Sequence, residues 1–197
     1  MKRHLDLGCG LRPRNPYLAD LTFGCDLRAI DGEVEDIGFV YKRVNLIVEP
    51  IPFPNNYFHS VSAYDFLEHI PRQTVLPNGG VCNPFVDLMS EIHRVLAPGG
   101  RLLALTPAYP HQAAFSDPTH VNIITEETHK YFTGEEPSGV IYGFKGRFDI
   151  IQVNWEASAN AYSLQQSGLR KMIRRTHRKI FNGGLSHLLW ELKAVKD

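Results

Sequence analysis

The chain has 197 residues, a formal net charge of +0 and 43% hydrophobic residues. This length suits one core, and we expect residues 1–197 to form a single domain. Zero net charge excludes a whole-protein field that would gather nucleic acid or anionic membrane. The three cysteines share no metal-type spacing, and so odd and sparse a count is typical of a reducing compartment and not of a disulfide framework. Because no apolar run reaches membrane-spanning length, we expect a cytoplasmic protein.

The first half of the chain alternates short apolar segments with turn residues. Pro13 and Pro16 disfavour a long helix after the first segment, because proline breaks helices and restricts the residue before it. Strands connected in this way predict an open α/β sheet. The predicted strands cover residues 3–7, 22–26, 40–46 and 60–64.

A helix and a fifth strand are predicted after a loop over residues 75–84. Apolar side chains recur at helical spacing from Phe85 to Leu96, and the sequence Ala-Pro-Gly-Gly ends the helix. A strand over residues 101–106 follows directly. We expect residues 107–146 to form a region of loops and helix that caps a substrate cleft.

The C-terminal part is predicted to complete the sheet. Residues 148–155 and 187–196 alternate in hydrophobicity, and we expect them to form an antiparallel edge. Between them, residues 164–181 have the pattern of a basic amphipathic helix. Such a helix is either a docking surface for RNA or an acidic partner, or a solvated basic face.

A glycine turn follows the first strand, in the sequence Asp6-Leu7-Gly8-Cys9-Gly10. Glycines at a strand end allow a sharp turn and a close approach of the backbone to a ligand. A dinucleotide site would have a third glycine and a helix N-terminus for the pyrophosphate, but Pro13 occupies that position. The turn therefore fits a ligand without a pyrophosphate, or it is a turn that binds nothing.

Asp26 ends the second strand, sixteen residues beyond Gly10. A carboxylate offers two acceptor oxygens, which suit the two hydroxyls of a ribose. The comparable acid of dinucleotide sites lies about 20 residues beyond the glycines, so the spacing indicates a nucleoside lying across the first two strands. The alternative is a solvated loop aspartate.

Five motifs in chain order resemble the class I methyltransferases that bind S-adenosylmethionine, in their small single-domain form. The resemblance covers residues 4–106. It implies a Rossmann-like α/β fold with a mostly parallel seven-stranded sheet, and S-adenosylmethionine as the cofactor. The motifs are HLDLGCG at 4–10, GCDL at 24–27, PIPFPNNYF at 50–58, SVSAYDFLEHI at 60–70 and EIHRVLAPGGRL at 91–102.

The resemblance also implies which residues hold the cofactor. The glycine turn would hold the methionine end, the end of the second strand the ribose, and the end of the fourth strand would lie near the sulfonium. An asparagine stands where the family usually has an aspartate near the adenine amino group. The proline-bearing link after the turn departs from the family's long first helix. The implied residues are Asp6, Gly8, Cys9, Gly10, Asp26, Leu27, Asn45, Tyr64 and Asp65.

Methyl transfer is an in-line displacement from an activated donor, so an enzyme needs mainly to position the reactants. A general base is needed only where the nucleophile carries a proton of high pKa. His69 is one candidate, because histidine titrates near neutrality; alternatively it only begins a helix. Asp117 and His120 are further candidates, in which the carboxylate either orients the imidazole or caps a turn.

The histidines of the region after the fifth strand do not predict a metal site. His111, His120 and His129 are spaced nine residues apart, which fits no compact metal motif, and we expect no metal. The expected activity is O- or N-methylation of a small-molecule or glycan-type acceptor. The alternatives are an RNA methyltransferase that docks through residues 164–181, and a non-catalytic module that binds the cofactor or nothing.

Overall fold

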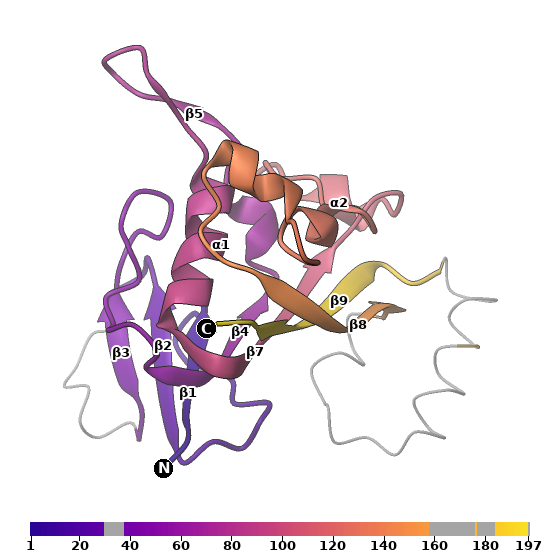
Figure 1. Ribbon diagram of the computed structural model, residues 1–197. Helices are drawn as coiled ribbons and strands as arrows, with labels where there is room; N and C mark the ends of the chain where they lie inside the picture. The colour runs from indigo at the N-terminus through magenta and orange to yellow at the C-terminus, as the bar shows by residue number, and fades with distance from the viewer. Residues whose placement is uncertain (30–37, 158–175, 177–183, 197) are drawn as a thin grey trace.

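A seven-stranded sheet forms the centre of the protein in a computed structural model, which describes residues 1–29, 38–157, 176 and 184–196. The strand order is β3-β2-β1-β4-β7-β9-β8 (Figure 1). The first five strands in this order pair in parallel, whereas β9 pairs antiparallel with both of its neighbours. The predicted mostly parallel sheet with an antiparallel C-terminal edge is confirmed. The strands are β1 (Arg3–Leu7), β2 (Leu21–Asp26), β3 (Val40–Arg43), β4 (Phe58–Tyr64), β7 (Leu96–Pro107), β8 (Phe148–Glu156) and β9 (His187–Ala194).

One face of the sheet carries the main hydrophobic core. Helix α1 (Pro84–Val95) crosses this face in Figure 1. The helix begins with a proline, which suits a first helical position because its missing N–H would be unpaired there anyway. Its apolar side chains pack against inward-facing residues of the central strands, such as Leu5 and Val61. The buried residues of the helix are Pro84, Phe85, Leu88, Met89, Ile92 and Val95.

Several predicted boundaries shift by one or two residues, and three features differ more clearly from the prediction. Strand β3 ends at Arg43, because Asn45 begins a turn in which its carbonyl accepts from the N–H groups of Val48 and Glu49. Strand β7 begins at Leu96, before the predicted start, with a register shift over the glycine-rich segment. The predicted loop over residues 75–84 contains a small antiparallel hairpin, formed by β5 (Thr74–Val75) and β6 (Val81–Cys82).

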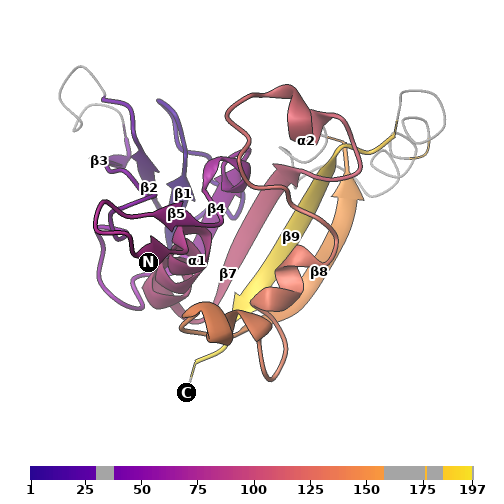
Figure 2. The same cartoon turned by 90° about the horizontal axis from the view of Figure 1, so that it is seen from above.

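The region over residues 107–146 divides into two parts. Helix α2 (Ala113–Ser116) lies beyond the carboxyl end of β7 (Figure 2). The short 3₁₀ helices η3 (Thr128–Tyr131) and η4 (Ser138–Tyr142) belong to the second part, whose Phe132 and Phe144 are buried in the main core. The second part therefore completes the core with its aromatic side chains, while the capping of a substrate cleft by this region stays a prediction.

Two further expectations concern the rest of the chain. The predicted basic helix over residues 164–181 lies outside the described residues, apart from Thr176. Within the described ranges, no helix combines the length and the apolar character that a membrane span requires.

A buried chain of polar side chains lies on the opposite face of the sheet. His4 contacts Ser60 through Nδ1 at 2.8 Å and Ser62 through Nε2 at 2.9 Å. Ser62 donates its hydroxyl proton to Asp6 Oδ1 at 2.5 Å, so its oxygen accepts from Nε2–H of His4. Burial lowers the pKa of His4 to about 4, which keeps the imidazole neutral in the folded protein.

His4 should make folding stability depend on pH between about 6.5 and 4. The unfolded chain takes up the histidine proton first as pH falls, so His4 lowers the free energy of unfolding by up to about 3 kcal/mol across this window. His4→Gln cannot titrate. Its free energy of unfolding, relative to wild type, should therefore rise between pH 8 and pH 4.5 in urea titrations.

The exposed His59 of β4 offers the control His59→Gln, which should leave this pH dependence in place. A difference between His4→Gln and wild type that stays constant with pH would contradict a neutral, buried imidazole.

Candidate functional site

A pocket of about 260 Å³ lies at the carboxyl ends of the parallel strands. Ligands of open α/β sheets bind at this edge. The turns after four strands supply its walls, and His69 joins from the 3₁₀ helix η2 (Leu67–His69). The lining residues are Gly8, Asp26, Leu27, Arg28, Val44, Asn45, Leu46, Ile47, Asp65, Phe66, His69 and Ile70.

The glycine turn after β1 is closely packed on both sides. Gly8 and Gly10 have φ angles of 63° and 61°, in the left-handed region that favours glycine. A Cβ atom on Gly8 would lie 2.4 Å from the ring of Phe66. On the other side, the side chain of Cys9 packs where Gly24 of β2 has no Cβ. Only glycine at position 8 lets the turn pass beside Phe66 at the edge of the pocket.

Two buried carboxylates hold this turn through its backbone. Asp26 accepts from the N–H of Gly10 at 2.7 Å and from the N–H of Arg28 at 2.9 Å, through different oxygens. Asp6 accepts from the N–H of Arg14 at 2.7 Å. Burial raises the pKa of Asp6 to about 6, although the hydrogen bond from the N–H of Arg14 acts in the opposite direction. Each oxygen of Asp26 keeps a second lone pair, so its carboxylate can still accept from a ligand.

The predicted cofactor residues fall into two groups. Gly8, Asp26, Leu27, Asn45 and Asp65 all line the pocket. Asn45 accepts through Oδ1 from the N–H of Ile47, which fixes its amide against the pocket wall. The exposed Leu27 adds apolar surface beside it.

The second group of predicted cofactor residues does not line the pocket. Tyr64 is 4% exposed and packs with Leu103 and Leu105 on the opposite face of the sheet. Its predicted place near a sulfonium is corrected, because side chains alternate along β4 and Tyr64 follows Ser60 and Ser62. The other three residues of this group, Asp6, Cys9 and Gly10, belong to the glycine turn or hold it and do not line the pocket.

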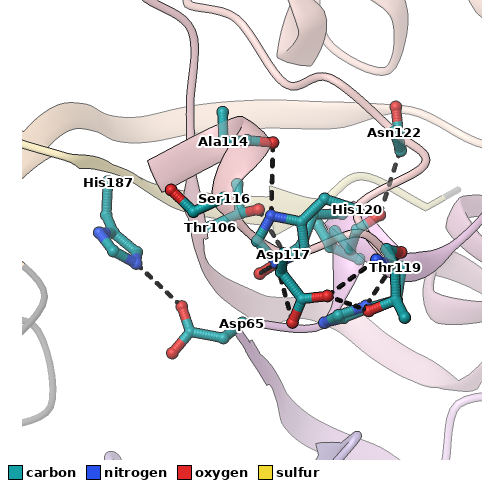
Figure 3. Close-up of polar contacts among 12 residues, drawn as sticks. Asp65, Thr106, Ala114, Ser116, Asp117, Thr119, His120, Asn122 and His187 are labelled. Atoms are coloured by element: carbon teal, nitrogen blue, oxygen red, sulfur yellow. Dashed lines mark hydrogen bonds and ion pairs between the residues drawn. The ribbon is translucent and has the colours of Figure 1, made fainter. Parts of the chain in front are cut away.

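Asp65 has a partner that the sequence did not reveal. Its Oδ1 lies 3.1 Å from Nε2 of His187, and Figure 3 shows the two side chains pointing toward one another. Nδ1 of His187 lies 2.7 Å from the hydroxyl of Ser186. His187 begins a strand with an ordinary alternating pattern, which carries no signal of this role. The pair fixes Asp65 at the wall of the pocket.

The predicted pairing of Asp117 with His120 differs from the structure. Asp117 Oδ2 lies 4.0 Å from Nε2 of His120, which is too long for a hydrogen bond. Asp117 Oδ1 instead accepts from the N–H of Thr119 at 2.8 Å and from its hydroxyl at 2.6 Å (Figure 3). These bonds depress the pKa of Asp117. Asp117 therefore caps the turn, which was the alternative interpretation of this residue.

The carboxylate that lies beside His120 in the interior is Glu68, which sequence reasoning missed as a site residue. Glu68 is 1% exposed, and its Oε1 lies 3.9 Å from Nε2 of His120. The rings of His120 and His69 lie edge to face, with centroids 4.9 Å apart. His69 thus links this group of side chains to the pocket. The only sequence signal was that Glu68 directly precedes a candidate histidine.

The other two evenly spaced histidines lie elsewhere. His111 accepts through Nδ1 from the N–H of Ala113. His129 is 6% exposed and lies against the ring of Trp190. The three evenly spaced histidines therefore do not converge, and only His120 reaches the site.

Comparison with known proteins identifies a family. Residues 5–104 match a family model described as a methyltransferase domain. No curated protein gives a significant sequence match.

Solved structures share the fold across nearly the whole chain. An S-adenosylmethionine-dependent methyltransferase from Archaeoglobus fulgidus is 16% identical, with a TM-score of 0.56 over 98% of this chain and 86% of its own. Geranyl diphosphate C-methyltransferase from Streptomyces coelicolor, solved with S-adenosyl-L-homocysteine, is 15% identical, with a TM-score of 0.55 over 99% and 71%. The [4+2]-cyclase SpnF is 16% identical, with a TM-score of 0.58 over 100% and 75%. At these identities the likeness shows the fold.

Gly8→Ala should disturb the turn beyond the cost of its backbone angle. A left-handed φ costs a non-glycine residue roughly 1–2 kcal/mol, and the new Cβ would also overlap Phe66. We expect lower stability in denaturant titrations and a loss of S-adenosylhomocysteine binding in calorimetry. Gly99→Ala is the matched control, because Gly99 has a φ of 73° and nothing within 4 Å of its Cβ position. Equal effects of the two changes would show that the contact with Phe66 is unimportant.

Proposed function

The chain belongs to the class I S-adenosylmethionine-dependent methyltransferase family, and we propose that it methylates an oxygen or nitrogen atom of a small-molecule or glycan-type acceptor. The observation that carries this proposal is the pocket at the carboxyl ends of the parallel strands, which adjoins a wall of imidazole and carboxylate groups. One side of the pocket suits a nucleoside, and the other suits a polar acceptor.

The nucleoside side is formed by the turns after β1, β2 and β3. Asp26 would accept from the ribose hydroxyls, since its two oxygens retain acceptor capacity. Leu27 and Ile47 would pack against the adenine ring, and Asn45 lies beside them. The glycine turn would approach the methionine end through its backbone. The cofactor supplies a methyl group that is activated by its sulfonium.

The acceptor side is supported by the polar groups beyond β4 and β7. Asp65 lines the pocket, held by His187, and its negative charge suits a position near a cationic sulfonium. His69 lines the same pocket, with His120 and Glu68 behind it. Polar groups at this wall favour an acceptor that forms hydrogen bonds, such as a hydroxyl or amine, over an apolar one.

Catalysis would consist mainly of positioning. An activated donor needs an acceptor atom held in line, and near-attack geometry is worth roughly 7–11 kcal/mol in well-oriented reactions. His69 and His120 would orient the acceptor, and they would either accept its proton themselves or hold a bound group that promotes loss of that proton. Asp117 would act through the turn that carries His120, as a positioning residue.

Two other functions stay open to test. The basic residues of 164–181 favour an RNA acceptor, although the described wall of the pocket carries Asp65, whose carboxylate would repel phosphate. The fold is also shared by a [4+2]-cyclase, so an activity other than methyl transfer is the second alternative.

Methyl-labelled S-adenosylmethionine offers a direct test of acceptor class. Incubated with separate pools of glycans, small metabolites and RNA, the protein should label the glycan or small-molecule fraction. Label in RNA alone would favour the RNA alternative, and no label in any pool would favour a function other than methyl transfer, whether another activity or cofactor binding without catalysis.

His120→Ala should lower the labelling rate by at least 10-fold, while the affinity for S-adenosylhomocysteine changes little, because His120 does not line the cofactor pocket. Labelling kinetics and calorimetry on the same preparations measure the two effects. An unchanged rate would leave His120 with a structural role only.

A further inference from the structure

Glu68, His69 and His120 converge beside the pocket. One ligand atom from each side chain lies within 4.8 Å of the other two. Glu68 and His69 come from η2, while His120 lies on the turn after α2, where Figure 3 shows its ring. The backbone fixes this approach, because the carbonyl of Glu68 accepts from the N–H groups of Val121 and Asn122.

The two carboxylate oxygens of Glu68 have different surroundings. Its Oε2 accepts from the hydroxyl of Thr106 at 2.7 Å, whereas the buried Oε1 has no hydrogen-bond partner among the residues that the structure describes. The residue is 1% exposed. Leaving a buried carboxylate oxygen unpaired is costly, so a proton, a water molecule or a bound ion at this oxygen would stabilise the site. It faces Nε2 of His120 at 3.9 Å, a separation too long for a hydrogen bond.

The two imidazoles are oriented so that each keeps a free lone pair. Nδ1 of His120 lies 3.3 Å from the carbonyl oxygen of Ala114, and Nδ1 of His69 lies 3.2 Å from that of Thr119. A carbonyl only accepts, so Nδ1 carries the proton in both rings and Nε2 carries the lone pair. Histidines that bind metals commonly donate their other N–H to a backbone carbonyl in this way.

We propose that Glu68, His69 and His120 bind a divalent transition-metal ion through Oε1 and the two Nε2 atoms. Two imidazoles and one carboxylate are the ligand set of catalytic zinc sites, which leave a coordination position open. Atoms bound about 2.1 Å from one ion lie at most about 4.2 Å apart. The contact of 3.9 Å between Glu68 and His120 meets this limit, and the three ligand atoms, which lie within 4.8 Å of one another, would have to draw closer by a few tenths of an ångström to bind one ion. This site replaces the expectation that the chain binds no metal.

The location of the ion indicates its role in catalysis. This role rests on the proposed function, whereas the binding of the ion does not. His69 lines the cofactor pocket, so the open coordination position would lie on the acceptor side. A metal ion lowers the pKa of a bound hydroxyl. An acceptor hydroxyl bound there would lose its proton to solvent, and its oxygen would then attack the methyl carbon as the bond from that carbon to sulfur breaks.

Metal titration tests the site without any need for activity. The probes are Co²⁺, followed by its visible absorption bands, and Zn²⁺, followed by calorimetry, on tag-free protein treated with a chelator. Wild type should bind one ion per chain. Glu68→Gln and His120→Ala should weaken binding by at least 10–100-fold, the loss that changes to groups behind the ligands already cause. His111→Ala, a histidine of the same segment outside the cluster, should bind as wild type does.

Binding of S-adenosylhomocysteine, measured by thermal shift, checks that each variant is folded. If Glu68→Gln does not fold, His120→Ala alone tests the site, because His120 lies on an exposed turn. The proposal would be overturned if wild type, with either ion in molar excess, bound no stoichiometric metal. The three side chains would then form only an imidazole–carboxylate contact. Undiminished binding by the variants would also overturn it. Metal binding without cofactor binding would instead contradict the proposed function and leave the metal site standing.

Discussion

The turn between β1 and residue 14 is held by hydrogen bonds from its backbone to the carboxylates of Asp6 and Asp26. The turn is not followed by a long helix, so these bonds and the packing of Cys9 against Gly24 determine its conformation. Its course in turn places Gly8 against Phe66 and leaves Asp26 at the pocket wall. The binding edge of the sheet thus depends on two acids that are paired with backbone N–H groups.

The polar side chains of the site have different kinds of support. Asp6 belongs to a buried chain through Ser62 to His4, which joins the glycine turn to the interior of the sheet. Asp65 is held by His187 across the end of β9. Among the described residues, Glu68 is hydrogen-bonded at one oxygen only. The convergence of this carboxylate with the imidazoles of His69 and His120, with ligand atoms within 4.8 Å of one another, is what favours a metal ion there.

Local patterns were sufficient to predict most of the sheet and several residues of the pocket wall. Alternating side chains predicted the strands, and the spacing from Gly10 to Asp26 predicted the pocket wall, because both features lie within short stretches of chain. Tyr64 was misplaced although the same alternation, followed from Ser60 and Ser62, assigns it to the opposite face. The approach of His120 to Glu68 could not be predicted, because it depends on hydrogen bonds between segments far apart in sequence.

The most direct measurement is the affinity of the protein for S-adenosylhomocysteine with and without the charge on Asp26. Asp26→Asn removes the carboxylate that holds Gly10 and faces the predicted ribose, and a hydrogen bond to a charged group is worth about 1.5–3 kcal/mol. Calorimetry should show wild-type binding that weakens by about 10–100-fold in Asp26→Asn. The change Asp20→Asn, at an aspartate that accepts from the N–H of Lys2 and does not line the pocket, should leave the affinity unchanged. Equal affinity of wild type and Asp26→Asn would place the cofactor elsewhere and contradict this account of the site.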